Sequence, residues 1–318
     1  MEQTQAVQPP RVLVVGAGAI GALYGGMLAR AGAEVSVVCR SDYDAVSVVG
    51  FDIQSKSWGD FVFRPAQVLR SAAQLLLAPD YVLLCVKTVR GLDRAALVRE
   101  AMGPKTVLTV IGNGIGIEQE LADAFPRNEL ISVLAFVAAS RVGTAGVRHQ
   151  ALGHLAMGSY PSGVSPAAQR LADLFVKAGV PCETKPQIAA SRWLKNLWNI
   201  AFNPISVLGG SLDTRTILAT EEGTEFVRRV MREAAAVAAA NGWPIADNVI
   251  DEAIASTRAM APYKTSMALD YEAGRPMEIE PILGNVVRSA RAHGVPVPSL
   301  EALYALALMV QERDTAAQ

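Results

Sequence analysis

Apolar residues in the first half of the chain gather in short runs, which are separated by stretches with helical spacing. The runs are rich in Val, Leu and Ile, as buried strands are, and they cover residues 12–15, 35–39, 81–86, 106–111 and 130–138. Helical spacing covers residues 19–31, 93–102, 118–125 and 165–178. Strands that alternate with helices predict a parallel sheet covered on both faces.

Three shorter stretches complete this half of the chain. Residues 51–63 and 143–158 alternate weakly and contain glycines, which predicts hairpins at an antiparallel edge of the sheet. Residues 180–184 predict one more short strand.

From residue 187 onward the strand pattern ends and the chain is almost entirely helical in its spacing. Helices are predicted over residues 190–208, 221–241, 246–260, 265–273, 280–292 and 299–312. Gly242 and Gly294 follow two of these helices, as C-terminal glycine caps do. The sequence therefore predicts an α/β domain over 1–186 and an all-helical domain over 187–318.

The composition fits two globular domains of ordinary size. The 318 residues are 51% hydrophobic and 19% charged, with a formal net charge of −1. This balance offers no basic surface for nucleic acid, and the apolar runs stop well short of the ~20 residues that a membrane span needs. Residues 1–10 lack the features of a secretion signal, so we expect a disordered lead-in and a cytoplasmic protein.

The cysteines and histidines show no metal-binding pattern. Three cysteines lie among apolar residues without a C-x-x-C pair, and we expect them to behave as small hydrophobic side chains. The three histidines lack the spacing of metal ligands. We therefore expect no metal site.

A glycine-rich segment follows the first predicted strand and opens the first predicted helix. Its spacing is G-x-G-x-x-G, in which the first glycine permits a tight turn, the second admits a pyrophosphate and the third lets the helix pack on the strand. This context predicts a Rossmann-type domain with a dinucleotide on the helix N-terminus. The candidate cofactor-binding residues here are Gly16, Gly18, Ala19, Ile20 and Gly21.

Arg40 lies at the end of the second predicted strand, about 20 residues past the glycines, where NAD-preferring enzymes usually carry Asp or Glu. A guanidinium there can pair with a 2′-phosphate, and no carboxylate is present to repel it, so NADPH is favoured over NADH. The alternative is a solvated arginine at a strand end.

Two more candidates follow predicted strands at the carboxyl edge of the sheet, where open parallel sheets bind ligands. Lys87 follows residues 81–86 and can lie over a cofactor phosphate or ribose. Asn113 follows residues 106–111 between two glycines and can reach the substrate or the nicotinamide. A solvated lysine and an asparagine that merely favours a turn are the alternatives.

The predicted helix over 190–208 carries one polar stripe on an otherwise apolar surface. Lys195, Asn199 and Asn203 recur every four residues and therefore share one face. An ammonium and two amides are costly to bury without partners, so this stripe should line a polar cleft. We expect Pro204 to kink the end of the helix. A surface lysine beside two structural asparagines is the alternative.

Polar candidates also occur downstream, in the segment YKTSMALDYEAGRPMEIE. Ser266 can hydrogen-bond to a substrate carboxylate, and Glu278 can orient Lys195 if the two helices meet. The sequence does not show whether they meet.

In their order, these motifs resemble the ketopantoate (2-dehydropantoate) 2-reductases over nearly the whole chain. The matching motifs are GAGAIG with Arg40 after the second strand, VKT at Lys87, NG-x-G-x-E from Asn113, K-x-x-x-N-x-x-x-N-P from Lys195, and S-M-x-x-D followed by E-I. Each motif alone is unspecific, whereas the ordered set is specific.

The resemblance implies an NADPH-dependent oxidoreductase that reduces 2-dehydropantoate to pantoate in pantothenate biosynthesis. It implies that hydride reaches the C2 carbonyl and that Lys195 acts as the general acid, with Glu278 assisting. The residues that it implies for substrate binding are Asn113, Asn199, Asn203 and Ser266, and those for the cofactor include Lys87, Asn113 and Glu278.

Two residues depart from the family pattern and leave alternatives open. Gly112 stands where Gln is expected, and Tyr263 stands where a small or polar residue is expected. Both changes can reshape the acyl pocket, so another branched 2-oxo acid is an alternative substrate. A 3-hydroxyacid dehydrogenase and a non-catalytic NADPH sensor are further alternatives. An apolar face of the helical domain can also be buried against a second copy in a homodimer.

Overall fold

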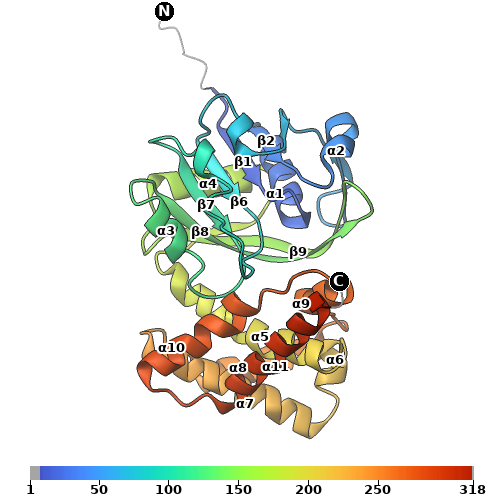
Figure 1. Ribbon diagram of the computed structural model, residues 1–318, viewed down its shortest axis with the longest axis vertical. Helices are drawn as coiled ribbons and strands as arrows, with labels where there is room; N and C mark the ends of the chain where they lie inside the picture. The colour runs from blue at the N-terminus through green and yellow to red at the C-terminus, as the bar shows by residue number, and fades with distance from the viewer. Residues whose placement is uncertain (1–7, 317–318) are drawn as a thin grey trace, which may run out of the picture. The chain divides into compact units, whose positions relative to one another are not determined.

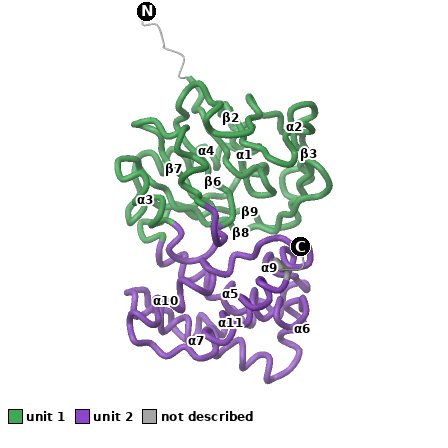
Figure 2. The backbone as a smooth tube through the Cα atoms, viewed as in Figure 1, with its two compact units in different colours: residues 1–87, 93–112, 118–188 green, residues 88–92, 113–117, 189–318 purple. Residues whose placement is uncertain are grey.

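The computed structural model describes residues 8–316, which form two compact units. Unit 1 contains residues 8–87, 93–112 and 118–188, and unit 2 contains residues 88–92, 113–117 and 189–316 (Figure 2). The expected disordered lead-in lies mostly outside the described residues. Pro10, which is described, accepts a hydrogen bond from the Glu34 amide.

Unit 1 is built on a ten-stranded mixed sheet, counted over the described residues, with the path β4-β3-β9-β8-β7-β6-β1-β2-β5 and β10 paired to β9 (Figure 1). The strands are β1 (Arg11–Val15), β2 (Glu34–Val38), β3 (Phe51–Ser55), β4 (Phe61–Phe63), β5 (Val68–Leu69), β6 (Tyr81–Leu84), β7 (Val107–Ile111), β8 (Leu130–Val142), β9 (Gly146–Ser159) and β10 (Cys182–Thr184). The consecutive pairs from β5 through β2, β1, β6 and β7 to β8 are all parallel. The prediction of an α/β fold with a parallel sheet is confirmed.

The helices of unit 1 connect these strands. They are α1 (Ala19–Arg30), α2 (Tyr43–Val49), α3 (Gln119–Ala124) and α4 (Pro166–Lys177), with 3₁₀ turns η1 (Ala72–Gln74) and η2 (Arg99–Ala101). Helix α4 begins where the sequence predicts it, because the Ser165 hydroxyl accepts the Ala168 amide and Pro166 takes the first helical position. The short helix α2 was not predicted.

The predicted helix over 93–102 is wrong. This segment forms turns and ends in η2, and its buried residues Ala95, Val98 and Ala101 are spaced by three. A repeat of three fits the three residues per turn of a 3₁₀ helix as well as it fits an α-helix, so the apolar spacing does not distinguish them.

One predicted hairpin is confirmed, and the other differs from the prediction in part. Strands β3 and β4 form an antiparallel pair within residues 51–63. Residues 143–145 are the turn of an antiparallel hairpin between β8 and the long strand β9, but β9 lies inside the sheet between β8 and β3 and not at an edge. The β8–β9 pairing shifts register after Phe136 and after Ala138. These irregularities interrupt the alternation of apolar and polar residues that would indicate a single long strand.

Unit 2 is all helical within the described residues, as predicted. Its elements are α5 (Ile188–Leu208, of which residues from 189 belong to this unit), α6 (Thr214–Ile217), α7 (Glu221–Ala240), α8 (Asp247–Ala259), α9 (Ser266–Glu272), the π-turn η3 (Glu280–Gly284), α10 (Asn285–His293) and α11 (Pro298–Ala316). Helix α5 continues four residues past Pro204. Its buried residues Ile200, Ala201 and Phe202 belong to the apolar core that the other helices of the unit share.

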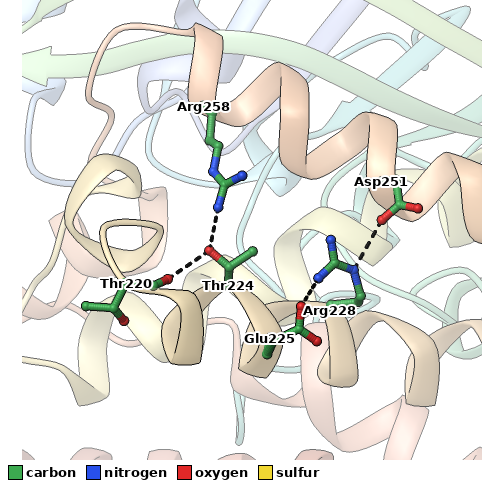
Figure 3. A network of polar contacts seen from close by, with 6 residues as sticks. All are labelled: Thr220, Thr224, Glu225, Arg228, Asp251 and Arg258. Atoms are coloured by element: carbon green, nitrogen blue, oxygen red, sulfur yellow. Dashed lines mark hydrogen bonds and ion pairs between the residues drawn. The ribbon is translucent and has the colours of Figure 1, made fainter.

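Polar contacts supplement this core where α7 and α8 pack together (Figure 3). Arg258 donates to the Thr224 hydroxyl over 2.7 Å, and Arg228 pairs with Asp251 over 3.2 Å and with Glu225 on its own helix. No helix in the described part of the chain is both long and apolar enough to span a bilayer.

The turn between β1 and α1 requires glycine for packing at Gly21. A Cβ there would lie 2.3 Å from the Gly16 carbonyl oxygen and 2.9 Å from a Val14 methyl group. A Cβ on Gly18 would meet nothing within 4 Å. We therefore expect Gly21→Ala to lower the free energy of unfolding by on the order of 3 kcal/mol, because the helix must move off the strand. Thermal denaturation of the purified protein measures this loss.

Gly18→Ala is the matched control, since it adds the same methyl group in the same turn. It should cost less than about 1 kcal/mol, the usual difference between these residues at a helix N-cap. Equal melting temperatures for the two variants would contradict this account of the turn.

Candidate functional site

Three of the predicted site residues form a continuous hydrogen-bonded chain in unit 2. The Lys195 Nζ donates to the Asn113 Oδ1 over 2.9 Å, and the Asn113 Nδ2 donates to the Glu278 Oε2 over 3.3 Å. The other oxygen of Glu278 accepts the backbone amide of Thr88 over 3.2 Å. The structure thus brings Glu278 beside Asn113, so that Glu278 reaches Lys195 through the asparagine amide.

Each member of this chain comes from a different part of the sequence. Lys195 lies on α5, Asn113 lies two residues past the end of β7, and Thr88 lies four residues past the end of β6. Glu278 precedes the π-turn η3. Single turns of π-helix, such as η3, are rare in proteins, and those that occur are frequently found at functional sites.

The segment 113–117 is held by backbone contacts that only glycine permits. Gly114 has a φ of +89°, and a Cβ there would lie 2.3 Å from the Pro281 carbonyl oxygen. That same oxygen accepts the Ile115 amide over 2.8 Å. The π-helical turn therefore contacts the backbone one residue past Asn113 and accepts a hydrogen bond from it two residues past Asn113.

Side chains that the sequence analysis did not single out complete this support. Arg192 donates to the Gly114 carbonyl over 3.3 Å, Asn285 donates to the Ile115 carbonyl over 2.6 Å, and Asn196 donates to the Ile282 carbonyl over 3.1 Å. Arg192 and Asn196 are buried polar residues on a largely apolar helix. That contrast was available in the sequence and would have identified them.

The remaining residues of the polar stripe share helix α5 with Lys195. Asn199 is 9% exposed and Asn203 is 1% exposed. Among residues 8–316, neither polar atom of the Asn203 side chain has a hydrogen-bond partner. An amide that is buried without a partner costs free energy, which a bound polar ligand would recover.

Ser266 is exposed at the start of α9, where Thr265 caps the helix by accepting the Ala268 amide. No hydrogen bond joins Ser266 to the Lys195 chain within the described residues. Tyr263 lies 6.3 Å from Trp198 between ring centroids, and Trp198 stacks on Phe202 at 4.8 Å. Trp198 directly precedes Asn199, so an aromatic cluster adjoins the polar stripe.

The electrostatic environment makes Lys195 an unusual lysine. Burial lowers the pKa of Lys195 to about 7, the nearby Arg192 cation lowers it in the same direction, and the Glu278 carboxylate opposes both effects. An amine with a pKa near neutrality can both release and regain a proton under ordinary conditions.

Unit 1 contains the turn that the sequence assigns to a dinucleotide. Gly16 has a φ of +95°, and a Cβ on it would lie 2.7 Å from the Val86 amide nitrogen. Gly18 leaves open space at the N-cap of α1, and the first turn of α1 carries no acidic residue. Free N–H groups at an unobstructed helix N-terminus suit a pyrophosphate, so the residues present fit this group.

The other two cofactor candidates lie near the ends of strands in unit 1. Arg40 is exposed two residues past β2, and no ion pair of Arg40 is found in the part of the chain that the structure describes. Lys87 is half-buried three residues past β6.

No group of three or more His, Cys, Asp or Glu side chains within residues 8–316 is placed to hold a metal ion. Cys39, Cys85 and Cys182 are free thiols. Burial raises the pKa of both Cys85 and Cys182 to about 12.

Comparisons with known proteins agree over most of the chain, in both units. Residues 12–162 match the family model "Ketopantoate reductase PanE/ApbA", and residues 187–311 match the model of its C-terminal domain. A 2-dehydropantoate 2-reductase from Nostoc is 31% identical over 298 residues, which cover 92% of each chain.

Solved structures give the same result. The crystal structure of 2-dehydropantoate 2-reductase from Methylococcus capsulatus is 51% identical with a TM-score of 0.90, covering 96% of this chain and 97% of that one. A D-mandelate dehydrogenase with NADH and anilino(oxo)acetate has a TM-score of 0.86 at 20% identity, covering 96% and 99%, which shows a shared fold. The chain therefore belongs to the ketopantoate reductase family, whose members are oxidoreductases that act on CH–OH groups.

Proposed function

We propose that this protein reduces the C2 carbonyl of 2-dehydropantoate to give pantoate, with NADPH as the cofactor and Lys195 as the general acid, in pantothenate biosynthesis. The hydrogen-bonded chain of Lys195, Asn113 and Glu278 is the observation that carries this proposal. Family membership and the 51% identity to a 2-dehydropantoate 2-reductase support the choice of substrate. We assign most of the cofactor-binding residues to unit 1 and the proton donor to unit 2.

The proton transfer follows from the order of the hydrogen bonds. Glu278 accepts from the amide nitrogen of Asn113, which leaves the amide oxygen turned toward Lys195. Asn113 thereby accepts an N–H of the ammonium and orients the amine. As the carbonyl carbon becomes tetrahedral, its oxygen gains negative charge, and Lys195 stabilises this charge and then donates a proton to give the hydroxyl group.

The cofactor supplies the hydride for this reduction when it is bound. Gly16, Gly18, Ala19, Ile20 and Gly21 would hold its pyrophosphate at the start of α1. The exposed guanidinium of Arg40 is suited to a 2′-phosphate, and Lys87 to a phosphate or ribose oxygen. We include Asn113 and Glu278 among the cofactor contacts.

Substrate recognition is assigned to the polar residues beside Lys195. Asn203 has a buried side chain whose donor and acceptor atoms have no hydrogen-bond partner within the described residues. Asn199 lies one turn nearer to Lys195 on the same face of α5. Together with Asn113 and the exposed hydroxyl of Ser266, they would bind the carboxylate and hydroxyl groups of the substrate.

A panel of 2-oxo acids tests the reaction and the substrate together. We expect purified protein to oxidise NADPH with 2-dehydropantoate at a higher kcat/KM than with any other acid of the panel. Reduction of NADP⁺ with a 3-hydroxyacid as the substrate, in the reverse direction, would favour the dehydrogenase alternative. Cofactor binding without turnover on any acid would favour a sensor and overturn the proposal.

A second candidate is the reduction of a different branched 2-oxo acid, and the position of Tyr263 favours it. The Tyr263 backbone is fixed to Thr214 by two hydrogen bonds, of 3.0 and 3.1 Å, and its ring adjoins Trp198. A large aromatic side chain therefore stands next to the ring of the residue before Asn199, at a position where the family pattern has a small or polar residue. Another acid of the panel that exceeds 2-dehydropantoate in kcat/KM would establish this candidate.

Replacing the proton donor should abolish turnover and leave the dinucleotide bound. We expect Lys195→Ala to lower kcat by at least about a hundredfold, the lower end of what a positioned acid contributes. The NADPH dissociation constant, measured by fluorescence, should stay close to that of the parent protein. Lys105→Ala is the control, because Lys105 is an exposed lysine of unit 1. Near-normal turnover of Lys195→Ala would remove Lys195 from the mechanism.

The assignment of the 2′-phosphate to Arg40 predicts a change of cofactor preference. Arg40→Asp should weaken NADPH binding about ten- to hundredfold, the equivalent of one lost charged hydrogen bond, and should improve NADH binding. Dissociation constants for both dinucleotides measure this effect, with Arg127→Asp as an exposed control in the same unit. An unchanged ratio of the two constants would show that Arg40 is only a solvated strand-end residue.

A further inference from the structure

Arg192 links the helix that carries the proton donor to the segment 113–117 in unit 2. It is 3% exposed and lies three residues before Lys195, so the two side chains leave neighbouring positions on one side of α5. Arg192 donates to the carbonyl of Gly114, while Lys195 donates to the side chain of Asn113, the preceding residue. One helical turn therefore holds two consecutive residues of the segment 113–117.

We propose that Arg192 is a positioning residue for Lys195, which fixes the segment that carries Asn113 and, as a buried cation one turn away, makes the ammonium a readier proton donor. This inference rests on the proposed function of Lys195 as the general acid. It assigns Arg192 no contact with the substrate or the cofactor.

The charged groups around Lys195 explain why the cation matters. Arg192 lies on the same helix, Glu278 lies before the π-turn, and the neutral amide of Asn113 lies between Glu278 and the amine. A carboxylate favours the charged form of the amine, and a guanidinium disfavours it. Burial, the Arg192 cation and the Glu278 carboxylate together bring the pKa of Lys195 to about 7, so removal of one of these charges moves it through the neutral range.

The structure also supplies a neutral counterpart for the bracing role. Asn285 donates to the carbonyl of Ile115, the residue after Gly114, and so restrains the same segment without a charge. Loss of Asn285 should disturb the segment, whereas loss of Arg192 should disturb both the segment and the proton donor.

The test compares three variants with the parent protein. Arg192→Lys keeps the charge, and Arg192→Gln keeps a hydrogen-bond donor but removes the charge. Asn285→Ala removes a neutral brace of the segment, together with the hydrogen bond that Asn285 accepts from Arg288. For each, kcat/KM for carbonyl reduction is measured against pH, together with thermal stability and NADPH affinity. In the parent protein the rate should fall as the pH rises through about 7, because reduction requires the protonated amine.

We expect Arg192→Gln to move this fall to higher pH by about 0.5 to 1 unit and to lower kcat on the acidic plateau by about tenfold. Arg192→Lys should keep the parent pH profile with a smaller loss of kcat. Asn285→Ala should lower kcat and leave the profile in place.

Parent-like profiles for both Arg192→Gln and Asn285→Ala would overturn the inference, because Arg192 would then act as a brace only. A displaced profile in folded Arg192→Lys would overturn it as well, so the inference can still be refuted if Arg192→Gln does not fold. Failure of the proposed function is distinguishable, since it appears as turnover by Lys195→Ala or as a parent profile without a fall near pH 7.

Discussion

The hydrogen bond from Lys195 to Asn113 is the interaction on which the arrangement of unit 2 depends most directly. An amine at the surface would be protonated throughout the physiological range and strongly hydrated, and it would be a poor proton donor. The structure partly withdraws it from water on a largely apolar helix and gives it an amide oxygen as a partner. The same withdrawal would be unfavourable without Glu278, which keeps negative charge within reach of the ammonium.

Placing that amide oxygen is largely a matter of backbone geometry. Asn113 is followed by a glycine that touches the carbonyl of Pro281, and the π-turn leaves this carbonyl available to the Ile115 amide. In a regular helix that oxygen would accept from a later residue of the helix itself. The irregular turn therefore provides a rigid support for the asparagine. Buried polar side chains of α5 and the partly buried Asn285 of α10 hold this support in place.

Much of this could be predicted from the sequence. The glycine spacing before α1 and the four-residue recurrence of Lys195, Asn199 and Asn203 are local patterns, and local patterns report local structure reliably. The hydrogen bond between Asn113 and Glu278 joins residues 165 positions apart, and no local pattern encodes such a pairing. The segment 93–102 and strand β9 were misread because a spacing of three and an interrupted alternation each fit two structures.

The assignment of residues 88–92 and 113–117 to unit 2 has a consequence for dissecting the molecule. Within the described residues the chain passes between the units at five peptide bonds, namely after residues 87, 92, 112, 117 and 188 (Figure 2). A fragment that starts at residue 189 would keep the lysine and lose the asparagine and the Thr88 amide. The helical unit therefore cannot be expressed alone as one continuous segment with its site intact, and no single cleavage of the polypeptide separates the two units completely.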